Sequence, residues 1–258
     1  MRRLLLALGL AFLWAPVLLL AAYAFSDSRV PFEWGGFSLR WFGALARNER
    51  ILEAAWLSLR IGAGSACLAT LLGLALGWVL ARHGPFRGRS LFGALAGAPL
   101  VLPEVVTGLA LLLLFVGLQS LTGWPAQRGA VTVWLAHSSL GMAYVAVLVQ
   151  ARLAVLDRTL EEAAADLGAS PFAVFRTVTL PLIAPSLAAG WLLAFTLSLD
   201  DVVLASFVSG PGATTLPVYL FSQLRLGMTP EANALAVVFL AVAGLFSGIA
   251  WVLRRRAG

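Results

Sequence analysis

Three acidic side chains stand inside long apolar segments of this 258-residue sequence. Glu104 follows Pro103 in one segment, and Asp200 and Asp201 stand side by side in another. A carboxylate deep in a membrane span costs about 2.5–3.5 kcal/mol on insertion scales, so it needs a compensating role. Carboxylate oxygens suit ammonium groups, and an aromatic face such as that of Trp191 suits the alkyl chain between two of them. These residues predict a path for a diammonium solute.

Each carboxylate also has a structural interpretation. Asp200 and Asp201 follow a long uncharged run, so in the structural interpretation they mark the outer end of a span. Neighbouring helix residues point about 100° apart, so at most one of the pair should face a narrow path squarely. In the structural interpretation, Glu104 is protonated and donates a hydrogen bond to a backbone carbonyl that lacks a helical partner because of a nearby proline. His137 is more typical of an interhelical hydrogen-bond partner than of a ligand.

The composition places these residues in lipid. Hydrophobic residues make up 60% of the chain and charged residues 12%, and the mean hydropathy is +0.92. A soluble core of this size cannot hide so much apolar surface. The net charge of +6 lies in loops and tails beside apolar segments, which indicates membrane orientation and no nucleic-acid partner. The single cysteine, Cys67, permits no disulfide framework.

Stretches of about 20 apolar residues predict an all-α polytopic membrane protein. Most of the arginines fall in inner segments if both termini are cytoplasmic, and this bias sets the predicted orientation. The first stretch is long enough to span and has no convincing cleavage site, so it is kept as a helix. The six predicted spans are 4–25, 53–81, 91–118, 129–151, 182–203 and 233–253.

The connections between the spans differ in character. Trp34, Trp41 and Phe42 lie in the first external loop and predict short amphipathic helices against the outer interface. Gly210 and Pro211 predict that the last external loop is irregular. No linker or repeat divides the chain, so 1–258 is predicted to be one transmembrane domain. Its predicted external loops are 26–52, 119–128 and 209–232, and its main cytoplasmic loop is 152–181.

The cytoplasmic loop has the strongest local pattern. Acidic residues and alanines favour a helix that begins near Glu161, and Gly168 can end it in a left-handed conformation. Ser170 and Pro171 suit the cap and first turn of a second helix. The prediction is two short helices joined by a tight corner, with apolar side chains such as Phe172 available to dock into a partner's groove.

This pattern resembles the EAA loop of bacterial ABC-importer permease subunits. The resemblance implies a type I importer permease fold with six transmembrane helices, and it makes the loop a coupling helix that inserts into a separate ATPase. An ordinary interfacial helix-turn-helix is the alternative. The matching elements are Glu162-Ala163-Ala164, Gly168 three residues later, and Val178-x-Leu180-Pro181. The residues expected to contact the ATPase are Glu162, Ala163, Ala164, Gly168 and Phe172.

The sequence contains no motif for ATP binding. No GxxxxGK[ST] phosphate loop occurs, so ATP and magnesium are expected on the partner ATPase, with no cofactor in this chain and no enzymatic activity. The resemblance implies alternating access in a bacterial inner membrane. Its expected partners are a homologous permease in a heterodimer, two ATPase copies, a periplasmic solute-binding protein and the lipid bilayer.

A second resemblance concerns the solute. The stretch 190–217 is similar to the second permease subunit of putrescine importers, with supporting pieces at 99–109, 123–126, 134–137 and 230–236. Putrescine is therefore the expected solute, with spermidine, ferric iron, phosphonate or sulfate as alternatives. An anion path should show arginines in the spans, and only Arg60 qualifies. An ion-coupled secondary transporter would also use intramembrane carboxylates but would leave the cytoplasmic loop unexplained.

Overall fold

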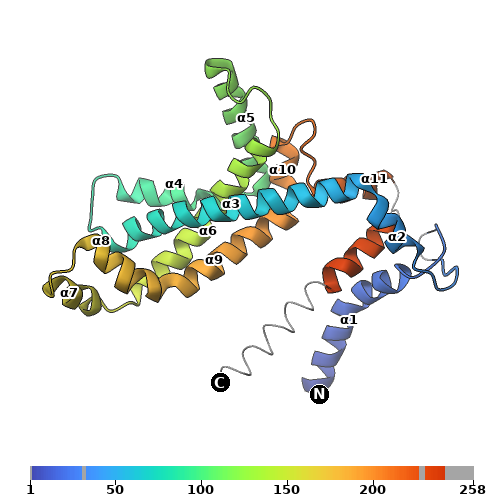
Figure 1. The fold of residues 1–258 in the computed structure, drawn as a ribbon, viewed down its shortest axis with the longest axis horizontal. Coiled ribbons are helices and arrows are strands. Elements are labelled where there is room, and N and C mark those ends of the chain that lie inside the picture. The colour runs from blue at the N-terminus through green and yellow to red at the C-terminus, as the bar shows by residue number, and fades with distance from the viewer. Residues whose placement is uncertain (1, 31–32, 227–229, 242–258) are drawn as a thin grey trace. The chain divides into compact units, whose positions relative to one another are not determined.

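The computed structural model describes residues 2–30, 33–226 and 230–241, and the elements among them are helical (Figure 1). These residues fall into two compact units. Unit 1 comprises the residues up to Glu53 and those from Tyr219 onward, and unit 2 runs from Ala54 to Val218. The predicted cytoplasmic loop and the three carboxylates all belong to unit 2.

The core of unit 2 is built from three long helices, α3 (Glu49–Arg82), α6 (Ala130–Ala154) and α9 (Leu180–Asp200). Small residues allow their backbones to approach closely, as is usual for helices that pack in lipid. A β-carbon on Gly73 would lie 2.6 Å from the β-carbon of Val145, and one on Gly141 would lie 2.9 Å from those of Ala69 and Ala194. The three helices therefore pack closely against one another and form the core of unit 2.

The prediction that the third span, 91–118, is a single helix is wrong. It consists of α4 (Arg89–Val101) and α5 (Glu104–Thr122), separated by extended backbone at Leu102 and Pro103. A proline restricts the residue before it to extended conformations and has no N–H to donate, so the helix ends there. Glu104 is consequently the first residue of a helix and does not lie in the middle of one.

A short helix, α10 (Val203–Val208), follows α9 and packs against α5 and α6. A β-carbon on Gly108 of α5 would lie 2.7 Å from the Phe207 ring, so the two helices touch closely there. Ala205 and Val208 are fully buried in a cluster with Phe115 of α5 and residues of α3 and α6. The end of α9 is thus anchored to the start of α5 through α10.

The predicted cytoplasmic loop contains α7 (Thr159–Asp166) and α8 (Pro171–Val174). The second helix is longer than the sequence predicts, because a π-helical turn, η1 (Phe175–Thr179), joins α8 to α9 without a break. The helical run Pro171–Asp200 is 30 residues long. Figure 1 shows α7 and α8 at the end of unit 2 where α3 turns into α4.

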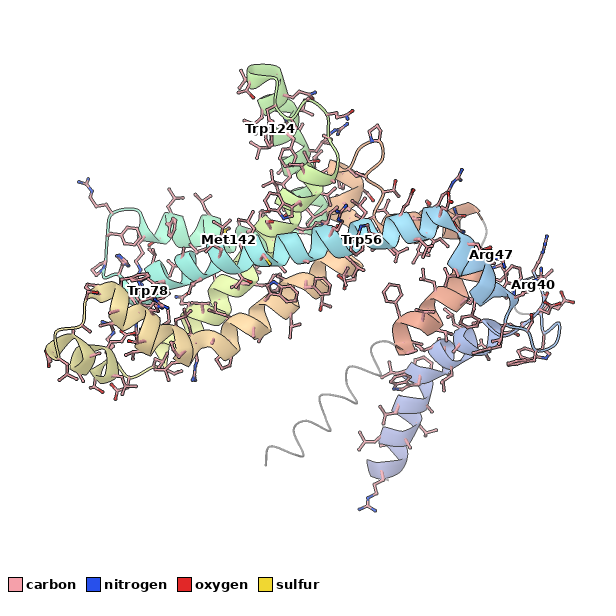
Figure 2. The ribbon with its side chains drawn as sticks, in the orientation of Figure 1. Arg40, Arg47, Trp56, Trp78, Trp124 and Met142 are labelled. Carbon is pink, nitrogen blue, oxygen red and sulfur yellow. The ribbon has the colours of Figure 1, made fainter. Side chains whose placement is uncertain are left out.

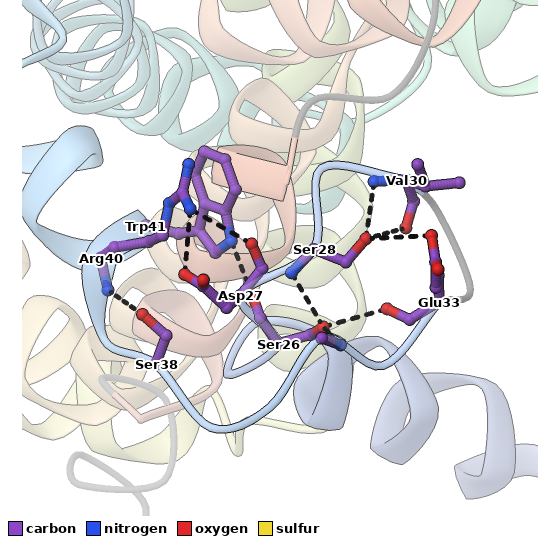
Figure 3. A network of polar contacts seen from close by, with 9 residues as sticks. Ser26, Asp27, Ser28, Val30, Glu33, Ser38, Arg40 and Trp41 are labelled. Carbon is purple, nitrogen blue, oxygen red and sulfur yellow. Dashed lines mark hydrogen bonds and ion pairs between the residues drawn. The ribbon is translucent and has the colours of Figure 1, made fainter.

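Unit 1 contains α1 (Arg2–Tyr23), α2 (Arg40–Arg47), most of α11 (Leu216–Leu226) and the helix Pro230–Ala241. The external loop predicted at 209–232 is irregular at Gly210 and Pro211, as expected, but its later part contains α11. The short helix predicted in the first external loop is present as α2, and its Trp41 is 7% exposed. Its Nε1–H donates to the Ser26 carbonyl at 2.8 Å, so it is buried within the first loop (Figure 3).

The same loop contains an ion pair between Asp27 and Arg40 at 3.0 Å (Figure 3). The hydrogen bond from the Arg40 guanidinium lowers the pKa of the exposed Asp27 carboxyl below its ordinary value. The Arg40 guanidinium also lies 4.4 Å from the centre of the Trp41 ring. Side-chain contacts therefore give this loop a defined conformation.

Five described helices are long and apolar enough to cross a membrane. They correspond to the predicted first, second, fourth and fifth spans and to the second half of the predicted third. The predicted sixth span, 233–253, begins in the helix Pro230–Ala241, and its remainder lies outside the described residues.

Candidate functional site: the coupling corner and the predicted path carboxylates

The corner between α7 and α8 is closed by backbone hydrogen bonds. The Gly168 N–H donates to the Ala165 carbonyl at 2.8 Å, and the Ala169 N–H donates to the Ala164 carbonyl at 3.2 Å. Gly168 itself has φ +86°, the left-handed conformation that this motif requires. The sequence-based prediction that Gly168 ends the helix in this way is confirmed.

The second half of the corner is capped by a side chain. Ser170 has extended backbone, and its hydroxyl accepts a hydrogen bond from the Ala173 N–H at 3.3 Å. Pro171 occupies the first turn, where its missing N–H leaves no helical hydrogen bond unmade. The predicted cap is confirmed, and the helix ends on both sides of the corner have hydrogen-bond partners.

The outer surface of the corner is apolar and open. Leu167 is 91% exposed and Phe172 is 71% exposed, at positions that flank Gly168 and the cap. Glu162 and Ala163 are also exposed, and Ala164 is half-buried. The residues that the sequence predicts for ATPase contact therefore lie together on one short helical hairpin.

The inner side of the corner is tied to the transmembrane helices by a residue that sequence reasoning missed. Glu161 Oε1 accepts hydrogen bonds from Arg82 of α3 at 3.1 Å and from the Thr179 hydroxyl of η1 at 2.8 Å. The Phe175 ring packs edge-on against Trp78 with ring centres 5.1 Å apart, and Figure 2 labels Trp78 at this end of α3. The sequence around Glu161 gives no sign that Arg82 and Thr179 are its partners, so its acidic side chain could not be distinguished from that of Glu162.

The two adjacent aspartates have different surroundings. Asp200 is the last residue of α9 and is exposed. Asp201 has extended backbone and is 8% exposed, and its carboxylate accepts the N–H groups of Leu204 at 3.1 Å and Ala205 at 2.7 Å. The pair therefore lies at the end of the fifth span, with one side chain outward and one folded into the first turn of α10.

His137 of α6 connects Asp201 to α9. Its Nε2 lies 3.0 Å from Asp201 Oδ2, and its Nδ1 lies 2.6 Å from the Ser198 hydroxyl. All three side chains are buried. The expectation that His137 is an interhelical hydrogen-bond partner is confirmed, whereas Ser198 carried no signal in the sequence that could have identified it.

The two remaining predicted path residues do not contact this cluster. Glu104 is exposed at the first position of α5. Trp191 stacks on Phe195 with ring centres 5.2 Å apart, and its Nε1–H donates to Cys67 Sγ at 3.3 Å. Nine residues of helix separate Trp191 from Asp200, or about 13 Å along the axis.

The class of protein follows from the fold, the corner and the family comparison together. Residues 73–256 match the family described as binding-protein-dependent transport system inner membrane component. The chain belongs to this family, and its apolar helices make it a multi-pass inner-membrane protein with the all-α fold of a type I importer permease. The resemblance of its cytoplasmic loop to the EAA loop is thereby confirmed.

Two relatives from Escherichia coli strain K12 are particularly informative. The chain is 53% identical over 256 residues to the putrescine transport system permease protein PotI, covering 99% of this chain and 91% of that protein. It is 39% identical over 230 residues to the spermidine/putrescine transport system permease protein PotC, covering 89% of this chain and 84% of that protein. Both relatives are transport subunits and not enzymes.

Solved structures support the same fold at low sequence identity. A chain of a bacterial ABC transporter that imports the acidic polysaccharide alginate matches with a TM-score of 0.72 at 15% identity, covering 98% of this chain and 94% of that one. A chain of the MetNI methionine ABC transporter in inward-facing form matches with a TM-score of 0.63 at 18% identity, covering 86% and 99%. These matches establish the fold alone.

Proposed function

We propose that this chain forms half of the translocation path of an ATP-driven importer for putrescine. The observation that carries the proposal is the 53% identity to PotI, which extends over 99% of the chain. The exposed Asp200 at the end of a span agrees with a path for a small organic dication. Within the path, Asp200 and Glu104 would accept the two ammonium groups, and Asp201 and Trp191 are the other predicted residues.

The α7–α8 corner couples this path to ATP hydrolysis. Its exposed Leu167 and Phe172 would enter a groove of an ABC ATPase, with Glu162, Ala163, Ala164 and Gly168 around them. Two ATPase copies would hold ATP and magnesium, and their closure would rock the helices of unit 2. A second, homologous permease chain would complete a heterodimer, and a periplasmic protein would deliver the solute.

The proposed orientation places the corner and both chain termini in the cytoplasm. Arginines gather at the end of unit 2 that carries the corner, among them Arg82, Arg89, Arg152 and Arg158. Arginine-rich ends of spans favour the cytoplasmic side. The whole chain would act as one transmembrane domain.

The test is uptake of labelled putrescine by proteoliposomes that contain this chain with its partner subunits and an internal supply of ATP. Unlabelled putrescine should compete, whereas arginine, phosphonate and ferric iron should not. Loss of uptake in Asp200→Asn or Glu104→Gln complexes that assemble normally would support the path. Competition by an anion would overturn the polyamine assignment while leaving the family unchanged.

Spermidine is the second candidate, because the chain is also 39% identical to PotC, a spermidine/putrescine permease. The same assay separates the two solutes. Spermidine that competes as strongly as putrescine would indicate a shared path, and weak competition would indicate a path selective for the shorter diamine.

A further inference from the structure

The Asp201 carboxylate already has three polar partners within the protein. Oδ1 accepts from the Leu204 N–H at 3.1 Å, and Oδ2 accepts from the Ala205 N–H at 2.7 Å and contacts His137 Nε2 at 3.0 Å. The residue is 8% exposed. Charge-assisted hydrogen bonds of this kind offset the cost of burying a carboxylate, and they leave Asp201 little capacity to bind a solute.

The histidine can make both of its contacts in one neutral tautomer. A carboxylate only accepts hydrogen bonds, so Nε2 carries the hydrogen and donates to Asp201. Nδ1 is then an acceptor, and the Ser198 hydroxyl donates to it at 2.6 Å. Because Ser198 belongs to α9 and His137 to α6, the ring orientation is fixed from two helices. This orientation in turn fixes the Asp201 side chain.

Helix α10 is held at its other end as well. The Thr132 hydroxyl of α6 donates to the Val208 carbonyl at 2.6 Å, so α6 holds both the start and the end of α10. Phe207 of α10 packs on Gly108, one turn after Glu104 in α5. Helix α10 is therefore in contact with the first turns of α5 through Phe207 and is joined to the residue after α9 through Asp201.

Asp200 differs from its neighbour in all of these respects. It is exposed and receives no hydrogen bond from another residue in the described part of the chain. We infer that His137 is a positioning residue of the solute path: it holds Asp201 in the cap of α10 and leaves Asp200 as the carboxylate that meets an ammonium group. This inference deepens the proposed function and rests on it.

The test measures the apparent KM for putrescine, at equal amounts of assembled complex, in five single variants and in the double variant His137→Leu/Asp201→Asn. Asp200→Asn removes the free carboxylate, and Asp201→Asn weakens the cap. His137→Leu removes both ring contacts at similar volume, whereas His137→Gln keeps a donor that can reach Asp201. Ser198→Ala removes only the hydroxyl that orients the ring.

We expect Asp200→Asn to raise KM roughly tenfold or more, which is the effect of losing one charge-assisted contact. His137→Leu and Asp201→Asn should each raise KM, and the double variant should be no worse than either single one, because both break the same connection. His137→Gln should recover most of the wild-type KM. Ser198→Ala should raise KM less than His137→Leu.

Two results would overturn the inference. One is a KM that Asp201→Asn raises while His137→Leu and Ser198→Ala leave it unchanged, since Asp201 would then contact the solute independently. The other is a His137→Leu complex that forms in lower amount but keeps the wild-type KM, which would reduce His137 to a packing role.

A second measurement needs no transported solute and separates this inference from the proposed function. Thermal unfolding of the purified complex in detergent is compared for His137→Leu, Asp201→Asn and the double variant. Strongly non-additive shifts of Tm are expected from residues in one hydrogen-bond network. If the wild-type complex takes up no putrescine, the proposed function fails, and additive Tm shifts would still overturn the His137–Asp201 connection.

Discussion

Arg82, the last residue of α3, donates a hydrogen bond across 3.1 Å to Glu161 in the first turn of α7. Their side chains are 10% and 21% exposed, so the ion pair is largely shielded from solvent. The same Glu161 oxygen accepts the Thr179 hydroxyl, which is buried. One carboxylate thus joins the coupling corner to a transmembrane helix and to the π-helical turn that begins the next one.

Replacement of Glu161 should weaken the attachment of α7 to α3 and η1. Glu161→Gln leaves the Arg82 guanidinium without its charge partner, and such a loss typically costs about 1–3 kcal/mol. We expect a lower Tm of the purified complex and basal ATP hydrolysis that responds less to solute. The neighbouring variant Glu162→Gln is the matched control, because Glu162 is exposed. It should reduce ATPase retention without lowering Tm, and equal Tm shifts in the two variants would contradict this assignment.

Gly168 should tolerate only residues that accept a left-handed backbone. A β-carbon there would meet nothing within 4 Å, so Gly168→Ala is strained by its φ of +86° and not by a clash. The strain amounts to about 1–2 kcal/mol. Co-purification of the ATPase should fall in Gly168→Ala and be better preserved in Gly168→Asn. Gly84→Ala, at an open position of ordinary φ, should leave co-purification unchanged.

Phe172 and Phe175 are separated by one turn but should behave differently. Phe172 is 71% exposed, so Phe172→Ala should leave the stability of the membrane subunit intact and release the ATPase. Phe175 packs on Trp78, so Phe175→Ala should lower Tm through lost aromatic contact. Tm and ATPase stoichiometry, measured on the same preparations, check both expectations. A Phe172→Ala complex that retains its ATPase fully would argue against docking through this corner.

The contact between α3 and α6 should be sensitive to single added methyl groups. A β-carbon on Gly77 would lie 2.7 Å from the Ala146 carbonyl oxygen, which cannot move without breaking α6. Overpacking of this kind costs about 1–3 kcal/mol, so Gly77→Ala should lower Tm and yield. Gly117→Ala is the control, since nothing lies within 4 Å of that position in α5. It should be neutral or slightly stabilising because alanine favours helix.

The features that sequence predicted well are local ones. The spans follow from runs of apolar residues, and the coupling corner follows from Gly168 and the Ser170-Pro171 cap, whose hydrogen bonds join residues only a few positions apart. In each case the pattern and its structural consequence lie in the same short segment. Physical chemistry of the backbone is then sufficient to predict the structure.

The features that sequence did not predict depend on distant partners. Glu161 and Arg82 are 79 positions apart, and His137 and Asp201 are 64 apart. Only the packing of α6 against α3 and α9 brings such residues together. The broken third span is a different case: Pro103 signals the break, but apolar residues continue on both sides and conceal it from a hydropathy criterion.

The uninterrupted helical run Pro171–Asp200 has a mechanical consequence. Its 30 residues span about 45 Å at 1.5 Å per residue, with the α7–α8 corner at one end and Asp200 at the other. A rod of that length that tilts by about 10° around one end displaces the other by roughly 8 Å. If the corner docks on an ATPase as proposed, the run would act as a lever arm, and a small tilt at the corner would displace Asp200 by more than the length of a hydrogen bond.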